Sequence, residues 1–266
     1  MDRLETPAAH SSGIEAALRR DRLIAVVGLV AVVALAWVYL WNSAAAMDHA
    51  AMGMMAMPYA MGPGARMLTF VMWTVMMVGM MLPSAAPTIL FYGALVRKNG
   101  ALGRVLPGVS IFAGAYLVVW TAFSAVATLL QAGLEHASLL NSTMAAADAR
   151  LGALLLVGAG VYQATPVKRV CLSKCRNPVE FFMTRWRGGA GGAFRMGLEH
   201  GAYCVGCCWV LMLLLFVAGV MNLLWVALIA AFVFVEKVFA AGPIASRAMS
   251  AVLIVSGLYL LVQHWN

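Results

Sequence analysis

The sequence is poor in charged residues, and acidic ones are the scarcest. Only 11% of its 266 residues are Asp, Glu, Lys or Arg, and 10 of these are acidic. Hydrophobic residues make up 64% of the chain, more than a soluble domain needs. The chain also lacks a nucleotide-binding loop, a Ser-His-Asp set and paired carboxylates, which argues against hydrolysis and phosphoryl transfer. This composition is typical of a membrane helical bundle.

The distribution of the basic residues argues against a nucleic-acid partner, although the net charge is +8. Lysines and arginines cluster between apolar runs, as the positive-inside rule requires of cytoplasmic loops. With the N-terminus in the cytoplasm, only Arg66 and Arg150 fall outside it. We therefore predict a multi-pass protein of the bacterial inner (cytoplasmic) membrane that binds no nucleic acid.

The apolar runs predict an all-α, polytopic transmembrane helical bundle of about seven spans, with six as the alternative. Residues 1–22 are expected to form a cytoplasmic leader, and residues 23–266 a single transmembrane domain. That domain contains a Met/His-rich outer loop, 42–65, and a basic, Cys-containing inner loop, 166–195. The spans are expected at residues 23–41, from 67 onward, and at 106–130, 151–165, 193–217, 223–238 and 249–262.

Three local features carry further expectations. Pro83 and Pro87 should kink or break the second span near its cytoplasmic end. Residues 177–186 resemble an interfacial helix whose aromatic side chains face lipid. Glu236 and Lys237 are expected to snorkel to the interface, although Glu236 is also the best carboxylate to support a metal site.

The most informative pattern lies at the start of the fifth span. On a helix, Met196, His200, Cys204, Cys207 and Cys208 fall within roughly a third of the circumference. Imidazole and thiolate are ligands of Cu(I) and Zn(II), and a polar ring inside a membrane segment indicates function. The pattern predicts a metal or redox site. The alternative is a packed helix start in which Cys and Met fill space.

A second pair of cysteines, Cys171 and Cys175, lies in the inner loop at a spacing that would place both on one helix face. The pair is a weak signal alone. It strengthens beside a thiol cluster on the same side of the membrane, in a compartment that keeps thiols reduced. The five cysteines are odd in number and are not spaced as a disulfide framework. Both therefore join the candidate metal ligands.

The outer loop is a separate candidate, because thioethers select Cu(I) in an oxidising compartment. It could equally be an apolar loop on the membrane surface. A methionine stripe in the second span, Met72, Met76 and Met80, is expected to pack in the core rather than to conduct metal. The candidate ligands of the outer loop are Met47, His49, Met52, Met54 and Met55.

Several of these motifs together resemble a bacterial domain of unknown function described as a predicted metal-binding integral membrane protein. The resemblance covers roughly residues 65–240 and implies metal binding by the His and Cys positions, without naming a reaction. The motifs that carry it are Met80-Met81-Leu-Pro83-Ser84-Ala-Ala-Pro87, Cys171–Cys175, Phe182–Trp186, Met196-Gly-x-x-His200-Gly-x-Tyr203-Cys204-x-Gly206-Cys207-Cys208-Trp209 and Glu236-Lys237.

We therefore predict a metal-binding inner-membrane protein that acts in copper transport, delivery or cuproenzyme assembly. Copper ion is the expected metal, and zinc is the alternative. Its expected partners are membrane lipid, the metal ion and a copper enzyme or periplasmic copper carrier. Two other functions stay open: a membrane-bound thiol or metal redox enzyme, and a non-catalytic subunit of a larger membrane complex. Whether the protein catalyses a reaction is left open.

Overall fold

The computed structural model describes residues 7–52, 63–98, 105–140, 145–146, 148–239 and 242–264. Throughout these residues the regular structure is helical, apart from one isolated bridge between Leu140 and Ala146, which confirms the all-α class. The helices are α1 (Pro7–Met52), α2 (Pro63–Lys98), α3 (Val105–His136), α4 (Ala149–Ala164), α5 (Pro166–Arg176), α6 (Pro178–Arg185), α7 (Gly189–Leu213), α8 (Leu215–Ala218), α9 (Leu223–Val238) and α10 (Gly242–His264).

Five stretches of helix are long and apolar enough to cross a membrane, so the chain is a multi-pass membrane protein. The two remaining predicted spans correspond to α4 and α9, of 16 residues each. A helix of that length reaches about 24 Å, less than the ~30 Å hydrocarbon core. Seven spans therefore stay a prediction. The five candidate spans are Arg20–Ala46, Gly64–Lys98, Val105–His136, Gly189–Ala218 and Ile244–His264.

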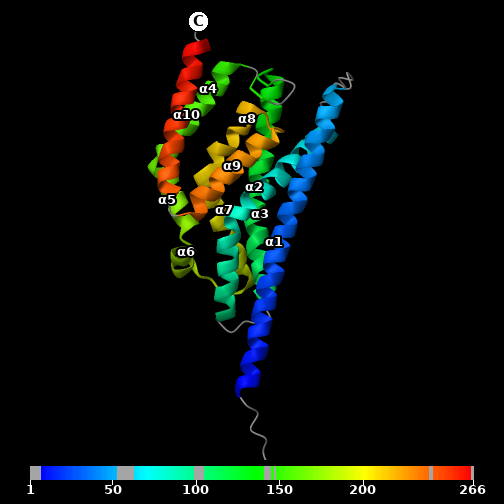
Figure 1. Ribbon diagram of the computed structural model, residues 1–266, viewed down its shortest axis with the longest axis vertical. Coiled ribbons are helices and arrows are strands. Elements are labelled where there is room, and N and C mark those ends of the chain that lie inside the picture. Colours follow the sequence, from blue (N-terminus) through cyan, green and yellow to red (C-terminus); the bar gives the residue numbers. More distant parts are fainter. Residues whose placement is uncertain are drawn as a thin grey trace, which may run out of the picture.

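The helices that surround the predicted site lie in the middle of the molecule (Figure 1). Helix α7 packs against α3 and α5, α2 packs against α3 and α9, and α4 pairs with α10 at one side. Helix α1 lies along the opposite side against α2, and most of its span is exposed. The beginning of α1 and the C-terminus lie at opposite ends of the molecule. That placement suits an odd number of crossings.

Helix α2 runs without a break through both of its prolines, Pro83 and Pro87, so the predicted break does not occur. Neighbouring hydroxyls support the turn that contains Pro83. The Ser84 hydroxyl donates to the Met81 carbonyl at 2.9 Å, and the Tyr116 hydroxyl from α3 donates to it at 3.2 Å. Such side-chain support is how proline is tolerated in membrane helices.

Two glycines of α7 allow α3 to approach closely. A Cβ added to Gly197 would lie 2.7 Å from the Ala115 Cβ, and one added to Gly201 would lie 2.9 Å from the Val119 Cβ. Real Cβ atoms do not approach this closely, so only glycine fits at either position. This contact brings α3, and with it Tyr116, against the cysteine-bearing face of α7.

The predicted inner loop is folded into α5, α6 and the start of α7. The prediction that its aromatic residues face lipid is wrong, because Phe181 and Phe182 are 1% and 2% exposed. Phe182 packs against the rings of Tyr92 and Phe112. These rings fill the protein interior beside α7, and Met183 takes the outward position, at 82% exposure.

Candidate metal centre

The face of α7 that carries the predicted ligands is buried, as the helical spacing indicated. Met196, Cys207 and Cys208 are no more than 1% exposed, and His200 and Cys204 are 3% and 2% exposed. Successive turns of one helix therefore point all five side chains into the protein interior. The Cys207 and Cys208 thiols each donate to the Cys204 carbonyl, at 3.1 and 2.9 Å, which fixes their direction within the turn.

Helix α5 adds the second pair of cysteines. Cys175 is buried, and its thiol lies near those of Cys204 and Cys207. The Cys171 sulfur lies over Gly206, only 2.8 Å from where a Cβ of that residue would stand. We call Cys175, Cys204, Cys207 and Cys208 the thiol cluster. It draws its sulfurs from two helices that are separate in the sequence.

The surroundings of the α5 cysteines keep them protonated. Hydrogen bonds with Cys204 and Cys207, together with burial, raise the pKa of the Cys175 thiol well above its ordinary value. Burial raises the pKa of the Cys171 thiol, and the neighbouring Cys207 adds to this effect. All five cysteines are free of disulfides, and an inert, buried thiol of this kind resists oxidation until a metal displaces its proton.

Helix α9 places a lysine at the thiol cluster. The Lys237 ammonium donates to the Cys204 sulfur at 2.9 Å and to the Ser84 hydroxyl at 3.3 Å, and it lies 3.9 Å from the Cys208 sulfur. The Tyr116 hydroxyl lies 3.0 Å from the Cys204 sulfur. Cys204 is therefore held between a cation that is suited to stabilise a thiolate and a phenol. Because the phenol proton is donated to the Met81 carbonyl, the phenol oxygen is left to accept from the Cys204 thiol.

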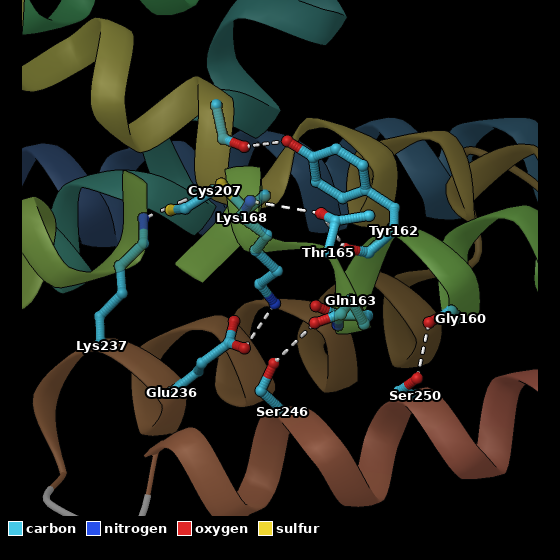
Figure 2. A network of polar contacts seen from close by, with 12 residues as sticks. Gly160, Tyr162, Gln163, Thr165, Lys168, Cys207, Glu236, Lys237, Ser246 and Ser250 are labelled. Carbon is cyan, nitrogen blue, oxygen red and sulfur yellow. Dashed lines mark hydrogen bonds and ion pairs between the residues drawn. The ribbon is translucent and has the colours of Figure 1, made fainter. Parts of the chain in front are cut away.

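Glu236 and Lys237 do not snorkel to the interface, so that prediction is wrong. Glu236 is fully buried and Lys237 is 6% exposed, because each has a buried partner. The Lys168 ammonium lies 2.5 Å from a Glu236 carboxylate oxygen. In Figure 2, Lys168 extends from α5 to Glu236 on α9, while the next residue, Lys237, is directed toward the cysteines.

Thioethers border the thiol cluster on the α2 side. The Met81 sulfur lies 3.9 Å from the Cys208 sulfur. The members of the methionine stripe are all buried, which fits packing in the core and a path for metal through it alike. The buried methionines of α2 are Met72, Met76, Met77, Met80 and Met81.

His200 lies in an aromatic enclosure one turn before Cys204. Its ring centroid lies 6.0 Å from that of Phe112, 5.8 Å from Tyr116 and 5.6 Å from Phe181. Its Nδ1 atom is buried and has no hydrogen-bond partner among the described residues. The ring therefore keeps a nitrogen lone pair or a proton that nothing nearby in the described structure uses.

These side chains are close together, but they do not form a ready metal site. Within the described ranges, no three His, Cys, Asp or Glu side chains have an arrangement that could hold a metal ion. The thiols of Cys207 and Cys208 donate to the Cys204 carbonyl, and the Cys204 sulfur accepts from Lys237 instead. Loading with metal must therefore replace these hydrogen bonds and rotate the cysteine side chains.

The Met/His-rich stretch is only partly described. Helix α1 continues to Met52, so part of the predicted outer loop is helical. Met47, His49 and Met52 lie within α1, but their side chains are outside the described part of the structure, and Met54 and Met55 lie outside the described residues altogether. Their role as ligands stays a prediction.

Four residues around the thiol cluster could not be assigned from the sequence: Tyr116 and Lys237, which contact Cys204, Ser84, which contacts Lys237, and Met81, which contacts Cys208. No sequence pattern marks Tyr116, Ser84 or Met81 as a neighbour of a metal site, and Lys237 was expected to be an interfacial charge. The only available signal was indirect: the Met80–Pro87 and Glu236-Lys237 motifs accompany the cysteine motifs in the resemblance. That signal places residues in one family pattern without showing that they touch.

The comparison with protein families fits this soft-ligand chemistry. Residues 70–260 match the family model PpoB2, described as a copper chaperone. Neither the curated proteins nor the solved structures include a match to the chain. The family confirms the prediction of copper handling and delivery. Because the match extends over well more than half of the sequence, the chain belongs to the PpoB2 copper chaperone family.

Proposed function

We propose that the protein holds Cu(I) at the thiol cluster, within the membrane, and passes it to a client copper protein. The observation that carries the proposal is the meeting of four thiols from α5 and α7 around Cys204, beside the Met81 thioether. Thiolate and thioether are the ligands that select Cu(I). Zinc, the alternative metal, also binds four thiolates, so the neighbouring thioether is the feature that favours Cu(I).

Lys237 suits this role because it offsets the charge of the loaded site. One Cu(I) ion held by two thiolates carries a net negative charge, which is costly to bury without compensation. The Lys237 ammonium already touches the Cys204 sulfur and lies near that of Cys208. It can keep these contacts while the metal replaces the thiol protons.

The buried methionines of α2 supply a route for the ion. Met72, Met76 and Met80 recur every four residues, which places them on one helix face, and Met77 and Met81 widen it toward Cys208. Thioethers bind Cu(I) weakly and exchange easily. The row leads from the thiol cluster toward the start of α2, which follows the Met/His-rich stretch.

The unpartnered Nδ1 atom of His200 makes this residue a further candidate ligand. Its aromatic neighbours restrict the ring, so it would join a copper ion only after the Cys204 side chain turns toward it. Cys171, which lies near Cys207, and Met196, which is buried on the same face of α7, are further candidates. The client protein is proposed to be a copper enzyme or a periplasmic copper carrier, and the membrane to be the bacterial inner membrane.

The test is the copper content of protein purified in mild detergent under reducing conditions and loaded with Cu(I). The Cys204→Ala variant should lose most of the bound copper. Leu211→Ala is the matched control, since it removes more volume from the same buried face but no sulfur, and it should retain copper. Thermal unfolding verifies that both variants fold.

Two results would overturn the proposal. Near-zero copper in the native protein after loading would exclude a tight Cu(I) site. Equal copper in the native and Cys204→Ala proteins would place the metal elsewhere. Stoichiometric zinc would favour the other metal, and reversible oxidation of the cysteines without bound metal would favour the redox alternative.

A further inference from the structure

A pocket of about 340 Å³ opens between α4, α5 and α10, and Lys168 is part of its wall. We propose that it binds the phosphate group of an anionic phospholipid. Its lining residues are Gln163, Ala164, Lys168, Arg169, Leu172, Ser173, Arg176, Ser246 and Arg247.

Three arginines line the pocket and make it positive, and one of them, Arg176, donates to the Phe239 carbonyl at 2.7 Å. Arg169 on α5 and Arg247 on α10 are both exposed and both line it. Among the described residues, neither lies within 4.0 Å of a carboxylate. Lys168 is already neutralised by Glu236, so the uncompensated charge belongs to the arginines. A guanidinium presents paired donors that match the oxygens of a phosphate.

A buried amide in the wall of the pocket has no partner. Gln163 is 3% exposed, and neither its Nε2 nor its Oε1 atom has a hydrogen-bond partner in the described structure. Leaving both ends of a buried amide unpaired is costly, and native proteins rarely do so. In Figure 2, Gln163 lies beside Ser246 and close to Lys168. A phosphate oxygen in the pocket would accept from its Nε2 atom.

The position of the pocket favours a lipid over a soluble anion. Arg247 is three residues beyond the start of the candidate span Ile244–His264, so the pocket opens at the edge of an apolar stretch. Val255 and Leu258 share the helix face of Arg247 and are 66% and 50% exposed. With the headgroup in the pocket, the acyl chains would lie along this face, and Leu172 and Ala164 would line the entrance.

The experiment is native mass spectrometry of the full-length protein in detergent. It is titrated with phosphatidylglycerol or with phosphatidylcholine of the same acyl chains. The native protein should bind phosphatidylglycerol more tightly. The double variant Arg169→Gln/Arg247→Gln should lose roughly thirtyfold in that affinity, the size expected when two arginine–lipid contacts are removed. Gln163→Met, which keeps the shape but removes the amide, should lose several-fold.

The matched control is Arg97→Gln/Lys98→Gln, which removes the same charge at the end of α2 and should bind as the native protein does. Equal binding of both lipids, or equal losses in the two double variants, would overturn the proposal, because either result shows that the pocket holds no specific anion. If glycerol phosphate saturates the pocket at the same concentrations as phosphatidylglycerol, the acyl chains contribute nothing, and the pocket does not select a lipid. Thermal unfolding distinguishes a folding defect from a binding defect.

Discussion

Two lysines of α5 each form an ion pair with a glutamate of another helix. The two pairs have the same nitrogen–oxygen distance, but one pair is buried and the other is exposed. In each pair the ammonium nitrogen lies 2.5 Å from a carboxylate oxygen. The side chains of Lys168 and Glu236 are 1% and 0% exposed, whereas those of Lys174 and Glu180 are 33% and 50% exposed. One pair connects α5 to α9, and the other connects it to α6, the next helix along the chain.

The comparison teaches that distance does not measure the importance of an ion pair. Water and salt screen the exposed pair, which contributes little whatever its geometry. The buried pair cannot lose one member without leaving a charge in the interior. It also joins the helix that carries Cys175 to the helix that carries Lys237, so its loss would reach the thiol cluster.

The largest expected effect comes from breaking the buried pair. Glu236→Gln leaves the Lys168 ammonium buried without a countercharge, and we expect the free energy of unfolding to fall by about 3–5 kcal/mol. Glu180→Gln, the matched change in the exposed pair, should lower it only slightly. Thermal unfolding in detergent measures both. Similar losses in the two variants would show that burial does not distinguish the pairs.

A double variant sharpens this result. Replacing a buried pair by apolar residues of similar volume is often neutral, so Lys168→Met/Glu236→Leu should recover most of the stability that Glu236→Gln loses. Failure to recover would mean that the pair contributes through its hydrogen bond and not only through the cost of an isolated charge.

The next largest effect concerns the other buried lysine. Lys237→Met removes the cation beside Cys204 and Cys208, and hydrogen bonds to charged groups contribute about 1.5–3 kcal/mol. We therefore expect Cu(I) to be held roughly tenfold to a hundredfold more weakly. Competition with a Cu(I) chelator measures the change. Lys174→Met, in the exposed pair, is the control. If it weakens Cu(I) binding as much as Lys237→Met does, the cause is the change in the net charge of the protein and not the contact with Cys204.

A smaller effect should follow a change in a methionine. Met81→Leu keeps a buried apolar side chain but removes the sulfur beside Cys208. We expect the copper content to stay the same and the transfer of copper to a chelator to slow several-fold, because a labile ligand is lost from the route. Met183→Leu, at an exposed position, should change neither. A lower copper content in Met81→Leu would mean instead that Met81 binds the copper ion held at the thiol cluster.

Much of the fold and one half of the site could be predicted from the sequence, because both depend on local periodicity. Long apolar runs predicted the all-α membrane class. The spacing of Met196 to Cys208 predicted a shared buried face, because residues on one helix keep their relative directions wherever the helix packs.

The other half of the site depends on contacts between distant segments. Lys237 and Ser84 meet although they lie 153 residues apart in the sequence, and no periodic pattern records that approach. Phe181 and Phe182 show the same limit: an aromatic, basic segment is typical of an interface, but here a packed neighbour covers its rings. The 16-residue α4 and α9 are also shorter than a usual membrane crossing, so the apolar runs alone do not establish the number of spans.

The smallest effect should appear when the exposed pair is titrated. The hydrogen bond from Lys174 holds the pKa of Glu180 below its ordinary value of 4.5. A carboxyl whose pKa is lowered in the folded state stabilises the fold above its unfolded pKa, and this contribution disappears as the pH falls through the lowered value. Thermal unfolding of the native and Glu180→Gln proteins should therefore differ slightly at neutral pH and converge in acid. Lys174→Met should reproduce the same small difference, since it removes the other member of the pair. A difference that widens in acid would mean that the folded state raises this pKa, and the exposed pair would then no longer be the weak partner in the comparison.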